Sequence, residues 1–155
     1  MKRSRQRGFT MVELIVSFTI LGILTSMAVP LAAYKVKRDK ERELRYALRE
    51  IRRAIDNYKD ASTAGKIDVK LGTEGYPESL EILVEGVKLS QSPDGKTIKF
   101  LRRIPKDPMT GTTDWGKRSM QDDPKSQSWG GQSVFDVYSK STERARDGTP
   151  YAEWN

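Results

Sequence analysis

The sequence contains neither cysteine nor histidine. Without cysteine the chain has no disulfide, no thiolate metal site and no cysteine nucleophile. Without histidine it lacks the commonest general base of enzymes and the commonest ligand of transition metals. It also lacks a G-x-S-x-G motif, a P-loop and a carboxylate pair in a recognisable catalytic frame. These absences argue against an enzyme.

Acidic side chains are scarce at the start of the chain. Residues 1–8 hold four basic and no acidic side chains, and residues 9–34 hold a single charge, that of Glu13. Residues 35–60 carry ten Lys or Arg against six Asp or Glu, whereas residues 61–155 carry fourteen of each. The net charge of +7 therefore belongs to the N-terminal part. The neutral C-terminal part weakens the case for a nucleic-acid partner, which needs a clustered cationic face.

Charge is absent altogether from residues 14–34, LIVSFTILGILTSMAVPLAAY. A helix of this length spans about 32 Å, which matches a bilayer core of ~30 Å. The basic residues before it would stay in the cytoplasm by the positive-inside rule, so we predict a single transmembrane helix. The alternative is a cleaved secretory signal, but its apolar core is usually only ~7–15 residues long, and Pro30 interrupts the small residues that a signal peptidase needs.

The hexapeptide GFTMVE, residues 8–13, lies between the basic leader and the apolar run. This arrangement resembles the prepilin signature of type IV pilins and type II secretion pseudopilins. The resemblance implies that a prepilin peptidase cuts between Gly8 and Phe9 and methylates the amino group of Phe9. It also implies that Glu13 neutralises the N-terminal ammonium of a neighbouring subunit, since two buried charges each cost several kcal/mol unless they meet. Alternatively, Glu13 lies at the cytoplasmic interface, where water reaches it.

Residues 35–60 contain no Gly or Pro and predict an amphipathic helix. We expect one helix from Phe9 to about Lys59, with a kink at Pro30, whose second half packs on a head domain. Charge pairs such as Glu41 with Arg45 are expected on its solvated face. Its apolar side chains recur at three- and four-residue steps, at Leu44, Ala47, Leu48, Ile51, Ala54, Ile55 and Tyr58.

The head is predicted to mix short helices and strands. Residues 61–75 read as a loop, residues 78–85 as a short helix that ends at Gly86, and residues 97–101, after a turn at 92–95, as a strand. A second strand is predicted over 133–139. The fold class is thus α+β: a long N-terminal helix, a small antiparallel sheet and long C-terminal loops.

A long loop, residues 103–131, separates the two predicted strands and holds three Pro, four Gly and two Trp. Loops of this length are usually functional or anchored by large side chains. We predict that Trp115 and Trp129 pin the loop onto the sheet, and a ligand role for them is the alternative.

Three stretches of the head, RIPKDPMTG…DWG, WGG…FDVYS and DGTPYAEW, resemble the head of the major pseudopilin of type II secretion. With the N-terminal signature, the resemblance covers most of the chain. Typical type IV pilins close their C-terminal loop with a disulfide, so the lack of cysteine favours a pseudopilin. The alternative is a type IV pilus or competence pilin that mediates adhesion, motility or DNA uptake.

The resemblance implies a structural subunit of a periplasmic filament that drives type II secretion. Its domains would be a cleaved leader (1–8), a transmembrane and polymerising half-helix (9–34), an amphipathic half-helix (35–60) and a periplasmic head (61–155). The implied partners are further copies of the chain, a prepilin peptidase, an inner-membrane assembly platform, minor pseudopilins and, before assembly, membrane lipid. The N-terminus would lie in the cytoplasm.

The major pseudopilins also hold a calcium ion in an acidic loop after the final strands. In residues 139–154 of this chain, Arg144 and Arg146 interrupt the acidic side chains, whereas calcium needs six to eight oxygens and a net negative cage. We therefore expect aromatic packing to hold this loop and no cofactor to be needed, with calcium as the alternative. The oxygens that remain come from Asp136, Glu143, Asp147 and Glu153, and the packing aromatics are Tyr151 and Trp154.

Overall fold

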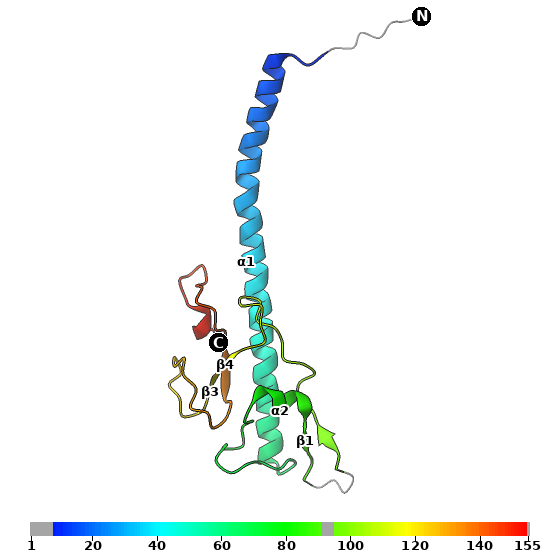
Figure 1. Cartoon of the computed structure of the whole chain (residues 1–155), viewed down its shortest axis with the longest axis vertical. Helices are drawn as coiled ribbons and strands as arrows, with labels where there is room; N and C mark the ends of the chain where they lie inside the picture. The colour runs from blue at the N-terminus through cyan, green and yellow to red at the C-terminus, as the bar shows by residue number, and fades with distance from the viewer. Residues whose placement is uncertain (1–7, 91–94, 155) are drawn as a thin grey trace, which may run out of the picture. The chain divides into compact units, whose positions relative to one another are not determined.

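The computed structural model (Figure 1) describes residues 8–90 and 95–154, apart from the side chains of residues 27–31. The chain divides into two compact units, Met1–Asp39 and Lys40–Asn155. The elements confirm the predicted α+β class. In chain order they are α1 (Met11–Thr63), α2 (Leu80–Glu85), β1 (Val87–Lys88), β2 (Thr97–Ile98), β3 (Gly116–Arg118), β4 (Asp136–Tyr138) and the 3-10 turn η1 (Tyr151–Glu153).

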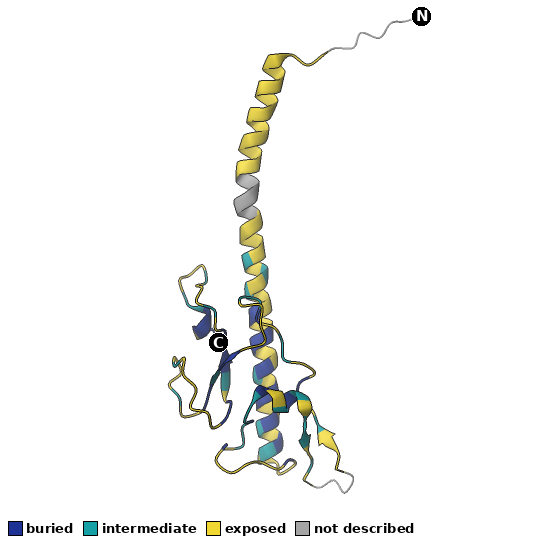
Figure 2. Ribbon diagram, viewed as in Figure 1, coloured by how far each residue is buried: buried dark blue, intermediate teal, exposed yellow. Residues whose placement is uncertain are grey.

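Helix α1 is 53 residues long and runs four residues past the predicted end at Lys59. It stops where the N–H groups of Gly65 and Lys66 turn back to the carbonyls of Ser62 and Ala61, with Gly65 in the left-handed region at φ 64°. The predicted kink at Pro30 falls on residues whose side chains are not described. The second half of α1 shows the predicted apolar stripe, which is buried along its length (Figure 2), at Leu44, Ala47, Leu48, Ile51, Ala54, Ile55 and Tyr58.

The short helix α2 ends as predicted at Gly86, which has φ 94° and donates its N–H to the Ile82 carbonyl. Strands β1 and β2 then pair antiparallel. The predicted strand 97–101 is wrong in length, because the N–H groups of Phe100 and Leu101 both donate to the Leu83 carbonyl of α2. These two residues leave the sheet to cover the helix. The predicted turn at 92–95 falls mostly outside the described residues.

Strand β4 is the centre of the predicted strand 133–139, and it pairs antiparallel with β3. Its partner therefore comes from inside the predicted loop 103–131. Buried and exposed side chains do not alternate at this strand, since Val137, Tyr138 and Ser139 are consecutive and all buried. The two pairs, β1 with β2 and β3 with β4, form separate two-stranded sheets among the described residues.

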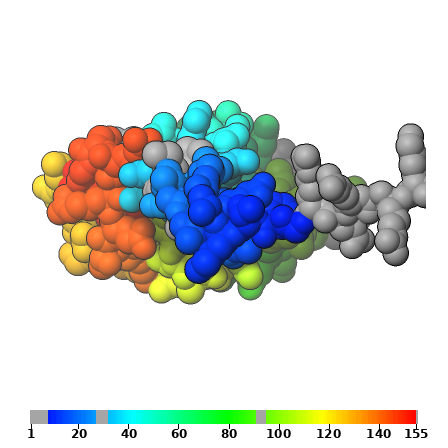
Figure 3. All heavy atoms as spheres, turned by 90° about the horizontal axis from the view of Figure 1, so that it is seen from above, coloured from blue at the N-terminus to red at the C-terminus, as the bar shows by residue number. Residues whose placement is uncertain are grey.

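The two tryptophans of the predicted loop differ in burial. Trp115 is 1% exposed and donates its Nε1–H to the Pro105 carbonyl at 2.9 Å, so its predicted role as an anchor is confirmed. Trp129 is 37% exposed, bonds the Ser133 carbonyl and lies under the Lys117 ammonium. In the space-filling view of Figure 3, the red and orange C-terminal residues adjoin the gold surface of this loop.

Candidate assembly site and C-terminal loop

Glu13 lies in the first turn of α1. Its backbone N–H donates to Thr10 Oγ1 at 3.3 Å, and the Leu14 N–H donates to the Thr10 carbonyl at 3.1 Å. Thr10 and Glu13 thus have the spacing of a helix-capping pair, and a carboxylate in the first turn favours the helix dipole. Among the described residues, no hydrogen bond or ion pair reaches the Glu13 carboxylate. Within the described residues, this carboxylate has no counter-charge.

The first half of α1 carries apolar side chains on every side. The large ones between Phe9 and Leu24 range from 47% exposed at Leu14 to 79% at Met11. At 3.6 residues per turn, their nearly consecutive positions cover the whole circumference of the helix. A helix that is apolar all round is normally covered by lipid or by other protein segments.

The few polar side chains of this segment bond within the helix. The hydroxyls of Ser17, Thr19 and Thr25 donate to the carbonyl oxygen four residues earlier, at 2.7, 2.8 and 2.7 Å. Such back-bonding satisfies the hydroxyl donor without water, as a segment in apolar surroundings requires. Within the part of the chain that the structure describes, no helix is both long enough and apolar enough to cross a membrane.

In the other unit, the C-terminal residues pack on α1 through aromatic rings. Tyr151 is fully buried and meets Trp154 edge to face at 5.0 Å, which confirms the predicted aromatic packing. The Tyr151 hydroxyl donates to Glu41 Oε1 at 3.0 Å, and the Arg45 guanidinium lies 4.5 Å from the Trp154 ring centroid. Burial and then the Glu41 carboxylate raise the pKa of the Tyr151 phenol well above its usual range.

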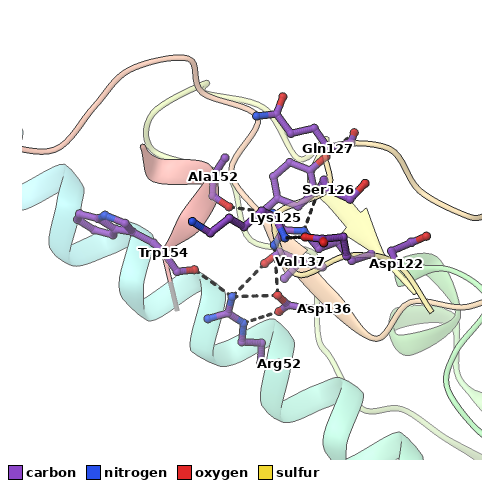
Figure 4. A network of polar contacts seen from close by, with 12 residues as sticks. Arg52, Asp122, Lys125, Ser126, Gln127, Asp136, Val137, Ala152 and Trp154 are labelled. Atoms are coloured by element: carbon purple, nitrogen blue, oxygen red, sulfur yellow. Dashed lines mark hydrogen bonds and ion pairs between the residues drawn. The ribbon is translucent and has the colours of Figure 1, made fainter. Parts of the chain in front are cut away.

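Two arginines bind the same segment, and Figure 4 labels one of them, Arg52. Arg52 of α1 donates to Asp136 Oδ1 at 2.7 Å and to the Trp154 carbonyl at 3.0 Å. Arg118 of β3 donates to the Ala152 carbonyl at 3.0 Å. The last residues of the chain are thereby joined to α1 and to β3.

Comparisons with known proteins identify the family. The sequence family described as prokaryotic N-terminal methylation motif matches residues 3–29. The type II secretion system core protein G of Klebsiella michiganensis is 32% identical over 118 residues, 72% of this chain and 73% of the relative. This chain belongs to the type II secretion core protein G family of pseudopilins. The same-named proteins of Pseudomonas aeruginosa and Escherichia coli are 28% identical over 155 residues (96% of this chain, 92% of the relative) and 32% identical over 109 residues (67% of each).

No solved structure gave a significant match. Membership of the core protein G family agrees with the pseudopilin resemblance that the sequence predicts and does not favour a type IV pilus or competence pilin. The individual assignments of Gly8, Phe9 and Glu13 stay predictions.

The calcium ion implied by the pseudopilin family can be tested against the donors of this chain. The Asp136 carboxylate contacts two guanidinium groups, at 2.7 Å from Arg52 and 3.5 Å from Arg118. The Asp147 carboxylate accepts the Thr149 N–H, which is the main cause of its lowered pKa. The described residues contain no group of three or more acidic side chains that could hold a metal ion. This donor set does not fit calcium.

Sequence reasoning missed Arg52, Arg118 and Glu41 as residues that fix the head of this pseudopilin. Arg52 follows the buried Leu48 by four residues, so its place at the edge of the apolar stripe was a usable signal. Nothing in the sequence distinguishes Arg118 from the other basic residues of its loop.

Proposed function

We propose that the chain is a structural, non-catalytic subunit of the type II secretion pseudopilus. A prepilin peptidase would cleave it between Gly8 and Phe9 and methylate the new N-terminus, after which it would polymerise into a periplasmic filament. The observation that carries this proposal is the first half of α1, which exposes apolar side chains on all sides and holds one carboxylate with no partner in the described chain. A polymer of such helices would cover the apolar surface and supply the missing cation.

Before assembly, lipid would cover the same surface. The charge-free residues 14–34 would be held in the inner membrane, with the basic leader in the cytoplasm and the head in the periplasm. Cleavage would remove four basic side chains and would leave the ammonium of Phe9 as the new terminal charge. The loss of these charges would make it easier for the helix to leave the membrane and enter a filament.

Within the filament, the Glu13 carboxylate would meet the Phe9 ammonium of a neighbouring subunit. Both charges would lie among apolar side chains, where an isolated ion costs several kcal/mol and a paired one far less. Only a neighbour at one axial offset can make this contact, so the pair would select the stagger between subunits. The inner-membrane assembly platform and minor pseudopilins would be the further partners.

The N-terminal chemistry can be tested directly. We expect intact-mass analysis of subunits from sheared filaments to give a chain that begins at Phe9 and carries one methyl group. Subunits that retain residues 1–8 in assembled filaments would refute the processing step. Loss of secretion on deletion of the gene, with normal inner-membrane insertion of the other pilus components, would support the role in secretion.

A further inference from the structure

The guanidinium group of Arg52 lies where three parts of the head converge. Its Nε donates to Asp136 Oδ1 at 2.7 Å, and its Nη2 donates to the carbonyls of Val137 at 3.2 Å and Trp154 at 3.0 Å. The Asp136 and Val137 oxygens belong to β4, and the Trp154 oxygen follows η1 (Figure 4). A single guanidinium group on α1 thus donates hydrogen bonds to one carboxylate and two backbone carbonyls.

Arg118 repeats this arrangement from strand β3. Its Nε donates to the Ser126 carbonyl at 2.8 Å and its Nη2 to the Ala152 carbonyl at 3.0 Å, while Nη1 lies 3.5 Å from Asp136 Oδ2. The Arg118 side chain is only 6% exposed. It also stacks on the Tyr138 ring, with the guanidinium carbon 4.2 Å from the ring centroid. The second cation therefore joins the long loop to the C-terminal residues.

The oxygens around these arginines are of the kind that calcium uses. A calcium site gathers carboxylate and backbone carbonyl oxygens around one positive centre. Here the N–H groups of two guanidinium ions occupy those oxygens, and a guanidinium offers five donors in a fixed plane. A single carboxylate between two such cations leaves a local surplus of positive charge, which repels a divalent ion.

A cavity next to these contacts is also lined by positively charged side chains. It lies between residues 139–144 and the C-terminal segment, and its described lining includes Lys140 and Arg144 but no Asp or Glu. Arg144 Nη1 donates to the Gly148 carbonyl at 2.9 Å, and Arg144 bridges to Pro150 through the backbone. The loop that would surround a calcium ion is thus closed by a basic side chain.

We propose that Arg52 and Arg118 replace the calcium ion of this pseudopilin family, so that the head is held together without metal. The cation that joins the C-terminal loop to the rest of the head is then part of the chain. It cannot be removed by a chelator or diluted away. All of these contacts lie within the compact unit Lys40–Asn155.

The first test needs no variant. The whole chain, purified in detergent, is melted in millimolar CaCl2 and in EGTA while tryptophan fluorescence is recorded. We expect the two Tm values to agree within about 1 °C, because a ligand that does not bind the native state does not stabilise it. A Tm higher by several degrees in CaCl2 would overturn the replacement of calcium.

The second test removes the guanidinium groups one at a time. Arg52→Met and Arg118→Met are compared with Arg53→Met, which makes the same chemical change at the next, exposed position of α1. We expect the first two to lower Tm by roughly 5 °C or more relative to the control in both buffers, since each removes charged hydrogen bonds. Arg52→Lys, which keeps the charge but loses the planar fork, should lie between.

Hydrogen exchange distinguishes a local loss of the arginine contacts to the C-terminal residues from a general loss of stability of the head. In Arg52→Met and Arg118→Met we expect amide exchange, relative to wild type, to accelerate more at residues 151–154 than along the apolar stripe of α1. Equal Tm values for Arg52→Met and Arg53→Met, or uniform acceleration of exchange over the whole head, would overturn the proposal.

Discussion

The ring of Tyr138 lies against the α-carbon of Gly116, its partner across strands β3 and β4. A β-carbon added at Gly116 would stand 2.2 Å from Tyr138 Cζ. The Tyr138 hydroxyl in turn donates to the Gln127 carbonyl at 2.8 Å, so the ring also holds the long loop. The pairing of β3 with β4 therefore depends on the absence of a side chain at Gly116.

We expect Gly116→Ala to lower the free energy of unfolding by about 1–3 kcal/mol or more, because the ring is fixed at its far end and cannot yield without loss of a hydrogen bond. Urea unfolding of the whole chain, followed by near-UV circular dichroism, measures this. Gly22→Ala adds the same methyl group where nothing lies within 4 Å and is the control. Equal stability of the two variants would show that the ring can move aside.

Substitutions of Glu13 test whether the chain is a filament subunit or only a membrane-anchored protein. Glu13→Ala and Glu13→Gln would leave the Phe9 ammonium of a neighbour buried without a counter-charge, at a cost of ~3–5 kcal/mol. We expect assembly to fall by on the order of a hundredfold or more, as measured by the shear fraction or by cross-linking. Glu13→Asp should fall between these variants and wild type.

Membrane insertion and leader cleavage are the controls for the Glu13 variants. Both should survive, since the substitution removes a charge from an apolar helix. Normal filaments from processed Glu13→Ala subunits would show that Glu13 is only an interfacial residue.

Tyr151 should make the stability of the head sensitive to alkaline pH. Its pKa in the folded chain is raised by burial and by Glu41, above the value of ~10 for an unfolded tyrosine. The neutral phenol is favoured by folding, so this contribution is complete below pH ~10 and is lost as the pH rises further. We expect the free energy of unfolding to fall as the pH rises above about 10, and Tyr151→Phe to reduce that fall.

Tyr46→Phe is the matched control, because Tyr46 is 61% exposed on the same helix. Unfolding curves of both variants across this pH range give the comparison. A slope that is the same in Tyr151→Phe, Tyr46→Phe and wild type would exclude Tyr151 as its source.

The unit Lys40–Asn155 contains the entire buried core of the head. Removal of residues 1–34, or of all residues through Asp39, should therefore give a soluble, folded monomer by size exclusion and near-UV circular dichroism. A deletion through Glu43 removes Glu41 as well and should melt at a lower temperature. Aggregation of the two shorter deletions under native conditions would contradict this boundary.

Local patterns in the sequence predicted the parts of the fold that local forces determine. The apolar period of residues 44–58 and the glycine stop at Gly86 are such patterns, and both were confirmed. Strand β3, in contrast, consists of one glycine and two basic residues with no strand propensity of their own. Their extended conformation comes from pairing with β4, a tertiary effect that outweighs intrinsic preference.

The polar contacts of α1 likewise depend on tertiary structure that local sequence patterns do not predict. Glu41 and Arg45 were expected on the solvated face. Arg45 is exposed there and Glu41 is half-buried, but their contacts with Trp154 and Tyr151 were not predicted. Arg52 bonds Asp136 across 84 positions of sequence. A charge pattern gives the side of a helix on which a residue lies but not the distant segment that meets it. The partners of these polar side chains in the C-terminal loop could for this reason not be predicted from the sequence, although the aromatic packing of Tyr151 and Trp154 could.

The hydroxyls of Ser17, Thr19 and Thr25 have a consequence for the proposed filament. Because each hydroxyl is already bonded to its own helix, the first half of α1 offers neighbouring helices van der Waals contacts but few hydrogen bonds. Helices packed through such a surface can slide and rotate past one another in small steps at little energetic cost. A bundle built this way would stretch and twist under load as a compliant spring, while the proposed pair between Glu13 and the Phe9 ammonium would restore the axial offset.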